Sequence, residues 1–122
     1  MPLLDSNILI YSGEPAFSSI LLPYITDPAN LVSAVSIVET LGYHKITADQ
    51  VLYFESLFKI LRIVPIDEIV IQKALHLRQL KKLSLGDAFI AATALVHNVE
   101  LISRNTVDFS GIAGLKIINP IP

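Results

Sequence analysis

The chain has 122 residues, of which 52% are hydrophobic and 16% charged, and its formal net charge is −2 at pH 7. This composition excludes a disordered chain, and the lack of cysteine excludes disulfides and thiolate metal sites. The net charge gives no overall attraction to nucleic acid. The longest apolar run, residues 88–96, is too short to span a membrane, and the first residues show no signal-peptide pattern. We therefore expect one cytoplasmic domain over residues 1–122.

Short apolar runs alternate with segments of helical period along the chain. Strands are predicted at 2–4, 31–33, 62–66, 99–102 and 116–118, and helices from residue 6 and over 34–46, 48–61, 68–82 and 84–95. Thr47 with Gln50 forms a predicted capping box for the helix 48–61, and Asp67 is the predicted N-cap of the next helix. Strands separated by helices of this length predict an α/β fold with three α/β/α layers and a central parallel sheet.

Four acidic residues are expected at one edge of this sheet. Asp5 directly follows the first strand, Glu39 lies in the helix after the second, and Asp108 follows the strand 99–102 across a short loop. Asp87 begins the helix that leads into that same strand, which places it at the same edge. Ligands bind at the carboxyl ends of such strands. We therefore expect the four carboxyl groups to converge on one pocket, with Asn105 beside them.

Each acid also has a structural alternative. Asp5 could cap its own helix, and Asp108 could start a turn. Ser36 with Glu39, and Ser84 with Asp87, each approximate a capping box. However, Glu39 lies among apolar residues in the sequence, where a carboxylate that is only solvated is badly placed.

Four carboxylates at one edge repel one another unless a cation lies between them. Mg²⁺ is the cation that this ligand type indicates, since it prefers carboxylates and water to nitrogen or sulfur. His44, His76 and His97 form no metal-binding pattern and are interpreted as surface or capping residues.

Four segments of the chain, in order, resemble the signature segments of the PIN-domain family, and within it the bacterial VapC-type toxin ribonucleases of toxin–antitoxin operons. They are LLDSNILIYS (3–12), SIVETLGY (36–43), LGDAFIAATAL (85–95) and LISRNTVDFSGIAGLKIINP (101–120). The resemblance implies a Rossmann-like fold, RNA cleavage that depends on Mg²⁺ or Mn²⁺, a cognate antitoxin as inhibitor, and a homodimer. It also implies that Asp5, Glu39 and Asp87 hold the metal.

One position departs from the family pattern. Asn105 stands where many members carry an acid, and Asp108 lies three residues later. Asn105 can offer a carbonyl oxygen or orient a metal-bound water, while Asp108 can supply the charge, so either could complete the site. Ser6 and Asn7 match the polar pair after the first acid, and they either orient the carboxylates or simply start the helix.

The mechanism that follows is hydrolysis by a metal-activated water, with Glu39 as the favoured proton acceptor. RNA-binding candidates are basic residues near the expected cleft: Arg78, Lys81, Lys82 and Arg104. For the first three, the structural alternative is a solvated helix end that favours cations. Tyr11 and Tyr43 are the candidates for stacking on bases.

Two other functions remain open at this stage. One is a PIN nuclease that processes RNA without an antitoxin. The other is a non-enzymatic receiver-like α/β module, which also gathers acids at strand ends. A receiver needs an acid at the end of a central strand and a lysine that ends a late strand, whereas here Asp87 lies in a helix start and Lys116 begins its strand.

Overall fold

The computed structural model describes residues 1–122 and contains one parallel sheet of five strands. The strands are β1 (Leu3–Leu4), β2 (Leu31–Ser33), β3 (Arg62–Val64), β4 (Leu101–Ile102) and β5 (Ile117–Ile118). Their order in the sheet is β3-β2-β1-β4-β5. The chain first adds β2 and β3 on one side of β1, and it then adds β4 and β5 on the other side. The boundary between β1 and β4 is therefore the topological switch point, where ligands of such sheets bind.

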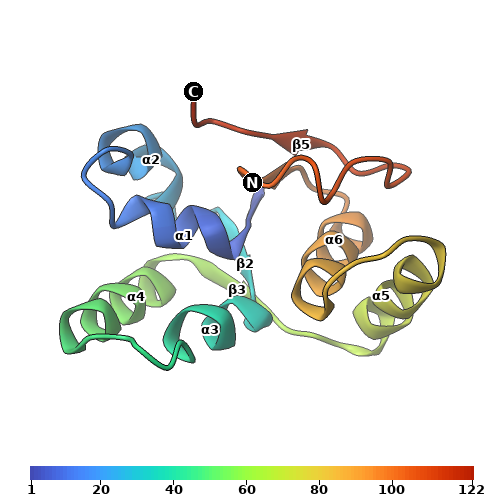
Figure 1. The fold of residues 1–122 in the computed structure, drawn as a ribbon, viewed down its shortest axis with the longest axis horizontal. Helices are drawn as coiled ribbons and strands as arrows, with labels where there is room; N and C mark the ends of the chain where they lie inside the picture. Colours follow the sequence, from blue (N-terminus) through green and yellow to red (C-terminus); the bar gives the residue numbers. More distant parts are fainter.

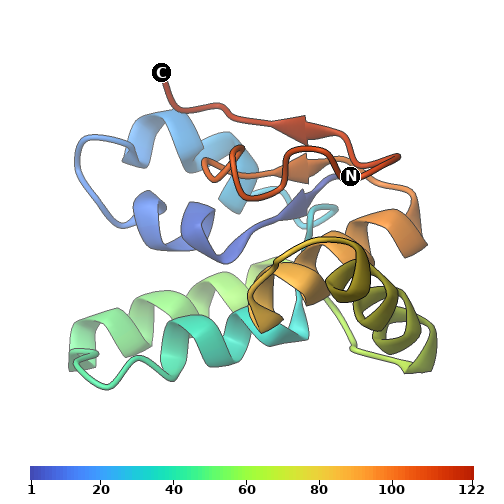
Figure 2. The ribbon, with the colours of Figure 1, turned by 45° about the vertical axis from the view of Figure 1, so that its right-hand side comes forward.

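Six helices surround the sheet, five of them on its two faces (Figure 1). They are α1 (Ser6–Ser12), α2 (Ser18–Ile25), α3 (Ala34–Leu41), α4 (Ala48–Ile60), α5 (Glu68–Leu80) and α6 (Leu85–His97). Helices α1, α2 and α4 lie on one side of the strands, while α5 and α6 lie side by side on the other (Figures 1 and 2). Helix α3 contacts α1 and α4 on one side and α6 on the other. The predicted three-layer α/β/α fold with a parallel sheet is confirmed.

Alternation along the strands divides the core into two clusters. Leu3, Leu31 and Leu101 pack in the cluster formed with α5 and α6. The residue after each of them, which points to the opposite face, belongs to the cluster formed with α1, α2 and α4: Leu4, Val32 and Ile102. Both faces of the three central strands, β2, β1 and β4, are thus buried, whereas the edge strands β3 and β5 are partly exposed.

Helix starts follow the sequence closely, with one correction. Thr47 and Gln50 form both bonds of the predicted capping box, and Asp67 caps α5. Helix α3, however, is capped by Ser33, whose hydroxyl accepts from the backbone N–H of Val35. The Ser36–Glu39 capping box, considered as the structural alternative for Glu39, does not form, because Ser36 already lies inside the helix and both side chains make other contacts.

Two stretches differ from the predicted elements. The predicted helix over 34–46 ends at Leu41, because Gly42 forms its C-cap and the chain then turns toward Thr47. Helix α2 lies where the sequence pattern predicted no element. It buries only Leu21 and Ile25 and contains Pro23, which normally breaks a helix, so its sequence carries no clear helical stripe. No helix of the protein is long and apolar enough to cross a membrane.

Candidate active site

The site begins at the switch point, where β1 and β4 end next to each other. Leu4 and Ile102 are partners in the sheet register, so the next residues, Asp5 and Ser103, emerge side by side. The Ser103 hydroxyl donates a hydrogen bond of 2.7 Å to Oδ2 of Asp5. Register between two strands far apart in the sequence thus decides which group meets the Asp5 carboxylate.

Asp5 occupies the N-cap position of α1, but its side chain makes no capping hydrogen bond. The residue is 4% exposed, and burial raises the pKa of its carboxyl group from 3.8 to about 6. The Ser103 hydroxyl lowers this pKa, and the nearby charges of Asp87 and Glu39 raise it. The Asp5 side chain therefore does not cap its helix, which was the alternative that the sequence allowed.

Glu39 is held by a pair of serines, one of them already expected to orient carboxylates. The Ser6 hydroxyl donates to Oε1 of Glu39 at 2.7 Å and lies 2.7 Å from the hydroxyl of buried Ser36. Because Ser6 has one proton and gives it to Glu39, Ser36 must donate to Ser6. Glu39 itself is exposed, so the expectation of apolar surroundings is wrong: its side chain extends from α3 toward α6, where it lies against Gly86.

Asp87 lies in the first turn of α6 and forms only half of the capping box. Its backbone N–H donates to the Ser84 hydroxyl at 3.1 Å, as predicted, but its carboxylate does not return the bond to the start of the helix. Burial raises the pKa of Asp87, the Ser84 hydroxyl lowers it, and the charges of Asp108 and Glu39 raise it. Asp87 is therefore electrostatically coupled to the other acids.

Asp108 lies opposite Asp87 across a cleft of about 240 Å³, which Lys82 also lines. The Asn105 side-chain amide donates to Oδ2 of Asp108 at 3.0 Å. The backbone N–H of Asn105 donates to the Ser103 hydroxyl at 2.9 Å. Asn105 thus ties Asp108 to the end of β4.

Ser103 is the site residue that the sequence analysis missed. Its hydroxyl donates to Asp5 and accepts from Asn105 and from Nδ2 of Asn7, the latter at 3.4 Å. Because the one Ser103 proton goes to Asp5, the amide of Asn7 must turn its nitrogen toward Ser103. The available signal was position: Ser103 directly follows a buried strand, as Asp5 does.

This orientation leaves the other end of the Asn7 amide without a partner. Oδ1 of Asn7 is buried and accepts no hydrogen bond. A buried oxygen of this kind costs about 1–3 kcal/mol unless a donor or cation reaches it. Asn7 therefore adds an unused oxygen beside the Asp5 carboxylate.

The donor set suits a hard cation in its chemistry, although the side chains do not form a compact cluster. The one ion pair of the structure joins Lys116 to Glu100, so none of the four acids has a cationic partner. Their oxygens, with that of Asn7, are of the type that Mg²⁺ prefers. No three His, Cys, Asp or Glu side chains are grouped tightly enough to hold an ion as they stand.

The predicted RNA-binding residues divide between two places. Nε of Arg78 donates to the carbonyl of Leu83 at 3.2 Å, which braces the turn between α5 and α6, whereas Lys82 reaches the acidic cleft. Lys81 lines a neighbouring cavity, described below. Arg104 packs on two aromatic rings instead, with its guanidinium 4.9 Å from the ring centre of Tyr11 and 5.1 Å from that of Phe17.

The aromatic candidates and the histidines are also placed. The ring of Tyr11 contacts the guanidinium of Arg104. Tyr43 is 52% exposed and packs edge-on against His44. All three histidines, His44, His76 and His97, are exposed, in agreement with their interpretation as surface residues.

Comparison with known proteins identifies the family. Residues 3–115 match the model of the PIN domain. The chain is 35% identical to a chain of a toxin–antitoxin complex from Klebsiella pneumoniae, with a TM-score of 0.78 and 98% of each chain covered. It is 26% identical to a chain of FitAcB from Neisseria gonorrhoeae, with a TM-score of 0.76 and the same coverage.

A DNA-bound VapBC from Salmonella typhimurium shares the fold, with a TM-score of 0.81, 19% identity, and 98% of this chain and 99% of that chain covered. No protein of curated function matches the sequence. The family match spans nearly the whole chain and is accompanied by acids at the switch point of the expected fold. The chain belongs to the PIN-domain family.

Proposed function

We propose that this chain is a metal-dependent endoribonuclease that acts as the toxin of a type II toxin–antitoxin pair. The observation that carries the proposal is the group of acids at the carboxyl edge of the sheet, none of which has a cationic partner. Asp5 is buried without a compensating cation, which costs stability, and its neighbours Asp87 and Glu39 add like charge around it, an arrangement that favours a cationic ligand.

The metal would be Mg²⁺ or Mn²⁺, held by Asp5, Glu39 and Asp87, with Asp108 and Asn105 completing the set. When bound, such an ion polarises a phosphate oxygen and lowers the pKa of a bound water. The protein's own part is to keep the carboxylates oriented. The Ser103 hydroxyl fixes Asp5, and the Ser6–Ser36 pair fixes Glu39.

Glu39 is the residue proposed to accept the proton of the attacking water. Ser6 bonds only to Oε1, so Oε2, which lies beside Gly86, has no hydrogen-bond partner, and the side chain as a whole is exposed. As the water oxygen bonds to phosphorus, the bond to the 3′-oxygen breaks and its electron pair leaves with that oxygen. Lys82, in the cleft with Asp87 and Asp108, offsets charge on the RNA backbone.

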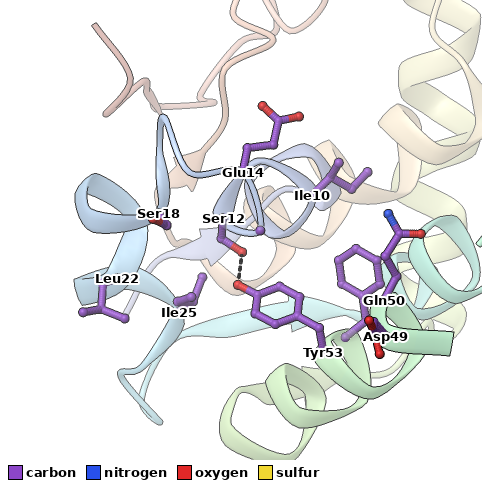
Figure 3. A pocket seen from close by; sticks show the side chains of 11 residues that line it. Ile10, Ser12, Glu14, Ser18, Leu22, Ile25, Asp49, Gln50 and Tyr53 are labelled. Carbon is purple, nitrogen blue, oxygen red and sulfur yellow. Dashed lines mark hydrogen bonds between the residues drawn. The ribbon is translucent and has the colours of Figure 1, made fainter. Parts of the chain in front are cut away.

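A groove on the other side of α1 supports the antitoxin partner. It lies between α1, α2 and α4, encloses about 600 Å³, and is lined by apolar side chains that include Ile10, Leu22 and Phe54. Figure 3 shows the 2.8 Å hydrogen bond between Ser12 of α1 and Tyr53 of α4 within this groove. An apolar segment of an antitoxin fits its lining, and the similar chain from Klebsiella pneumoniae comes from a toxin–antitoxin complex.

A homodimer is the proposed assembly. Mean hydropathy is +0.60, and large apolar side chains remain exposed around the start of α6. Leu80 is 71% exposed, Val38 70% and Leu85 57%. We expect light scattering at tens of micromolar to give a dimer or a complex with a small partner, whereas a bare monomer contradicts this part of the proposal.

Of the alternatives, a receiver module is excluded by topology. Receivers have the strand order 2-1-3-4-5, whereas this sheet has the order 3-2-1-4-5. A PIN nuclease without an antitoxin remains the second candidate, because its site would be the same. A small adjacent upstream gene for a DNA-binding antitoxin is the feature that distinguishes the two.

The direct test is RNA cleavage by the purified protein as Mg²⁺ or Mn²⁺ is titrated, with and without EDTA. We expect cleavage that rises with metal and is abolished by the chelator. Cleavage that persists in EDTA contradicts the metal dependence, and full activity on DNA with none on RNA contradicts the proposed substrate.

A further inference from the structure

A second cavity lies beside the acidic cleft and has the opposite charge. It encloses about 210 Å³ between α5 and the loop that joins β4 to β5. One wall carries Lys73, His76 and Lys81, and the other is formed by Gly111, Ile112 and Ala113. We call it the basic cavity. We propose that it binds a backbone phosphate of the RNA at a distance from the cleaved bond, an inference that rests on the proposed nuclease function.

The basic residues of this cavity have no counter-charge. No acidic residue lines it, and the only ion pair of the protein lies elsewhere, at Lys116. Lys73 and Lys81 are half-buried, so their aliphatic stems pack on the protein while their ammonium groups remain without an acidic partner. In a chain of net charge −2, this is a local concentration of positive charge that favours an anion.

The opposite wall has backbone N–H groups that are not used within the protein backbone. None of the backbone N–H groups of residues 111–113 donates to a backbone carbonyl. Gly111 has a φ of +77°, and a side chain there would meet no atom within 4 Å, so the backbone is open to a ligand. Successive free N–H groups next to a residue with positive φ are typical of anion-binding loops.

Attraction to the end of the helix does not account for this arrangement. A helix C-terminus favours cations in its last turn, and Arg78 fills that position in α5. Lys73 and His76 lie before the last turn and are spaced i and i+3, so they share one face of α5. What Lys73 and His76 have in common is that both line the basic cavity.

The basic cavity and the acidic cleft are lined by neighbouring stretches of the chain on both walls. Lys81 lines the cavity and Lys82 lines the cleft, while Asp108 of the cleft is three residues from Gly111 of the cavity. A single strand of RNA whose scissile phosphate lies at the acids can therefore continue over the basic cavity. A phosphate several bonds away would be held by charge, without reading the base.

The test compares long and short RNA. Fluorescence anisotropy in EDTA would measure binding of a labelled oligouridylate of about ten nucleotides, within the usual range of single-strand sites, and of a dinucleotide. For Lys73→Gln/His76→Gln we expect affinity for the longer RNA to fall roughly fivefold at 0.1 M salt, with a shallower salt dependence. The dinucleotide, which cannot reach the basic cavity, should show no difference between variant and wild type.

The matched control is Lys59→Gln/His97→Gln, which removes the same residue types from exposed positions near the ends of α4 and α6. It should bind like wild type, and Lys73→Arg should retain affinity because it keeps the charge. Thermal melting would show whether each variant is folded.

Four outcomes overturn the proposal: unchanged binding of the longer RNA by the variant, equal loss of affinity in the control, equal loss for the dinucleotide, or no binding of the longer RNA by wild type. A parallel cleavage assay in Mg²⁺ separates the two ideas. The expected binding pattern without cleavage supports the phosphate subsite and removes the nuclease proposal. Normal cleavage, together with RNA binding by Lys73→Gln/His76→Gln that equals wild type, supports the nuclease proposal and removes the phosphate subsite.

Discussion

Asp5 and Asp67 are the same residue type at the same position of a helix, yet the two have different roles. Asp67, the N-cap of α5, is exposed, and its Oδ1 accepts from the backbone N–H of Val70 at 3.0 Å. Asp5, the N-cap of α1, is 4% exposed and makes no capping bond, and its carboxylate is turned to Ser103. One aspartate stabilises its helix, while the other is buried at a cost.

The difference teaches that position in a helix does not define the function of an acid. A capping carboxylate has its charge compensated by backbone N–H groups and by water. The Asp5 carboxylate has the Ser103 hydroxyl and the backbone N–H of Ser6 to lower its pKa, two acidic neighbours that raise it, and no cation. The uncompensated charge of such a residue is better evidence for ligand binding than its position in the sequence.

The largest expected effect separates the two aspartates by activity. We expect Asp5→Asn to lower the rate of RNA cleavage by at least roughly a hundredfold, because it removes a proposed metal ligand. Asp67→Asn should cleave at the wild-type rate, since asparagine caps about as well as aspartate. Initial rates on one RNA under saturating Mg²⁺ would measure both. If Asp5→Asn cleaves normally, the distinction between the two residues is structural only.

The next effect concerns the pH dependence of folding without metal. The pKa of Asp5 is raised from 3.8 to about 6 in the folded state, so the folded protein holds this proton more tightly than the unfolded chain. The free energy of unfolding should therefore fall as pH rises through this window and level off above about pH 6, by at most about 3 kcal/mol. Urea unfolding in EDTA from about pH 4 to about pH 7 would measure the slope.

Asp5→Asn is the control for this slope, because it cannot ionise. The part of the slope due to Asp5 should disappear in the variant, which should be more stable than wild type at neutral pH. An identical slope in both proteins contradicts the burial cost assigned to Asp5. Asp87, whose pKa is also raised, contributes a slope of the same sign in both.

Asp87 at the start of α6 extends the comparison to a third helix start. We expect its carboxylate, like that of Asp5, to bind Mg²⁺. Saturation at about 100 times Kd stabilises a protein by about 2.7 kcal/mol, so Mg²⁺ should raise the melting temperature of wild type. In Asp87→Asn we expect a metal-free fold as stable as wild type or more stable, because repulsion is relieved, and no response to Mg²⁺. Calorimetry with and without Mg²⁺ would test this. A variant that still responds fully assigns Asp87 to capping alone.

The smallest effect is the capping energy itself. Asp67→Ala should lower the free energy of unfolding by about 1 kcal/mol, since it removes the side-chain acceptor for Val70. RNA cleavage below the melting temperature should be unchanged. Chemical denaturation would give the stability, and a loss of cleavage in the folded variant would show that Asp67 belongs with Asp5 after all.

Much of the fold could be predicted because its signals are local. The capping box at Thr47 and the N-cap at Asp67 depend on residues three positions away, and the strands depend on short apolar runs. Helix α2 was not predicted, because Pro23 disfavours a helix there. Its formation depends on packing against the surrounding core. The stretch 42–46 was wrongly extended as helix, since the local period continues past the glycine that ends α3.

The positions of the candidate acids in the fold could be predicted from the sequence, but the hydroxyl groups that hydrogen-bond to them could not. Asp5 and Asp87 stand out by their positions next to a strand end and a helix start. Ser103 did not stand out, because a single serine after a strand is common and its value lies in a partner 98 residues away. The exposure of Glu39 was also mispredicted, because its apolar sequence neighbours do not surround its side chain in space.

The sequence by itself determined the alternation of strands and helices and hence the parallel sheet, since hydrophobic period and capping act over a few residues. It also determined that acids would fall at one edge of that sheet. Only the tertiary structure decided which acids cap and which remain free, because the register of β1 against β4 sets Asp5 beside Ser103. That pairing depends on packing of both faces of the sheet, which no stretch of a few residues encodes.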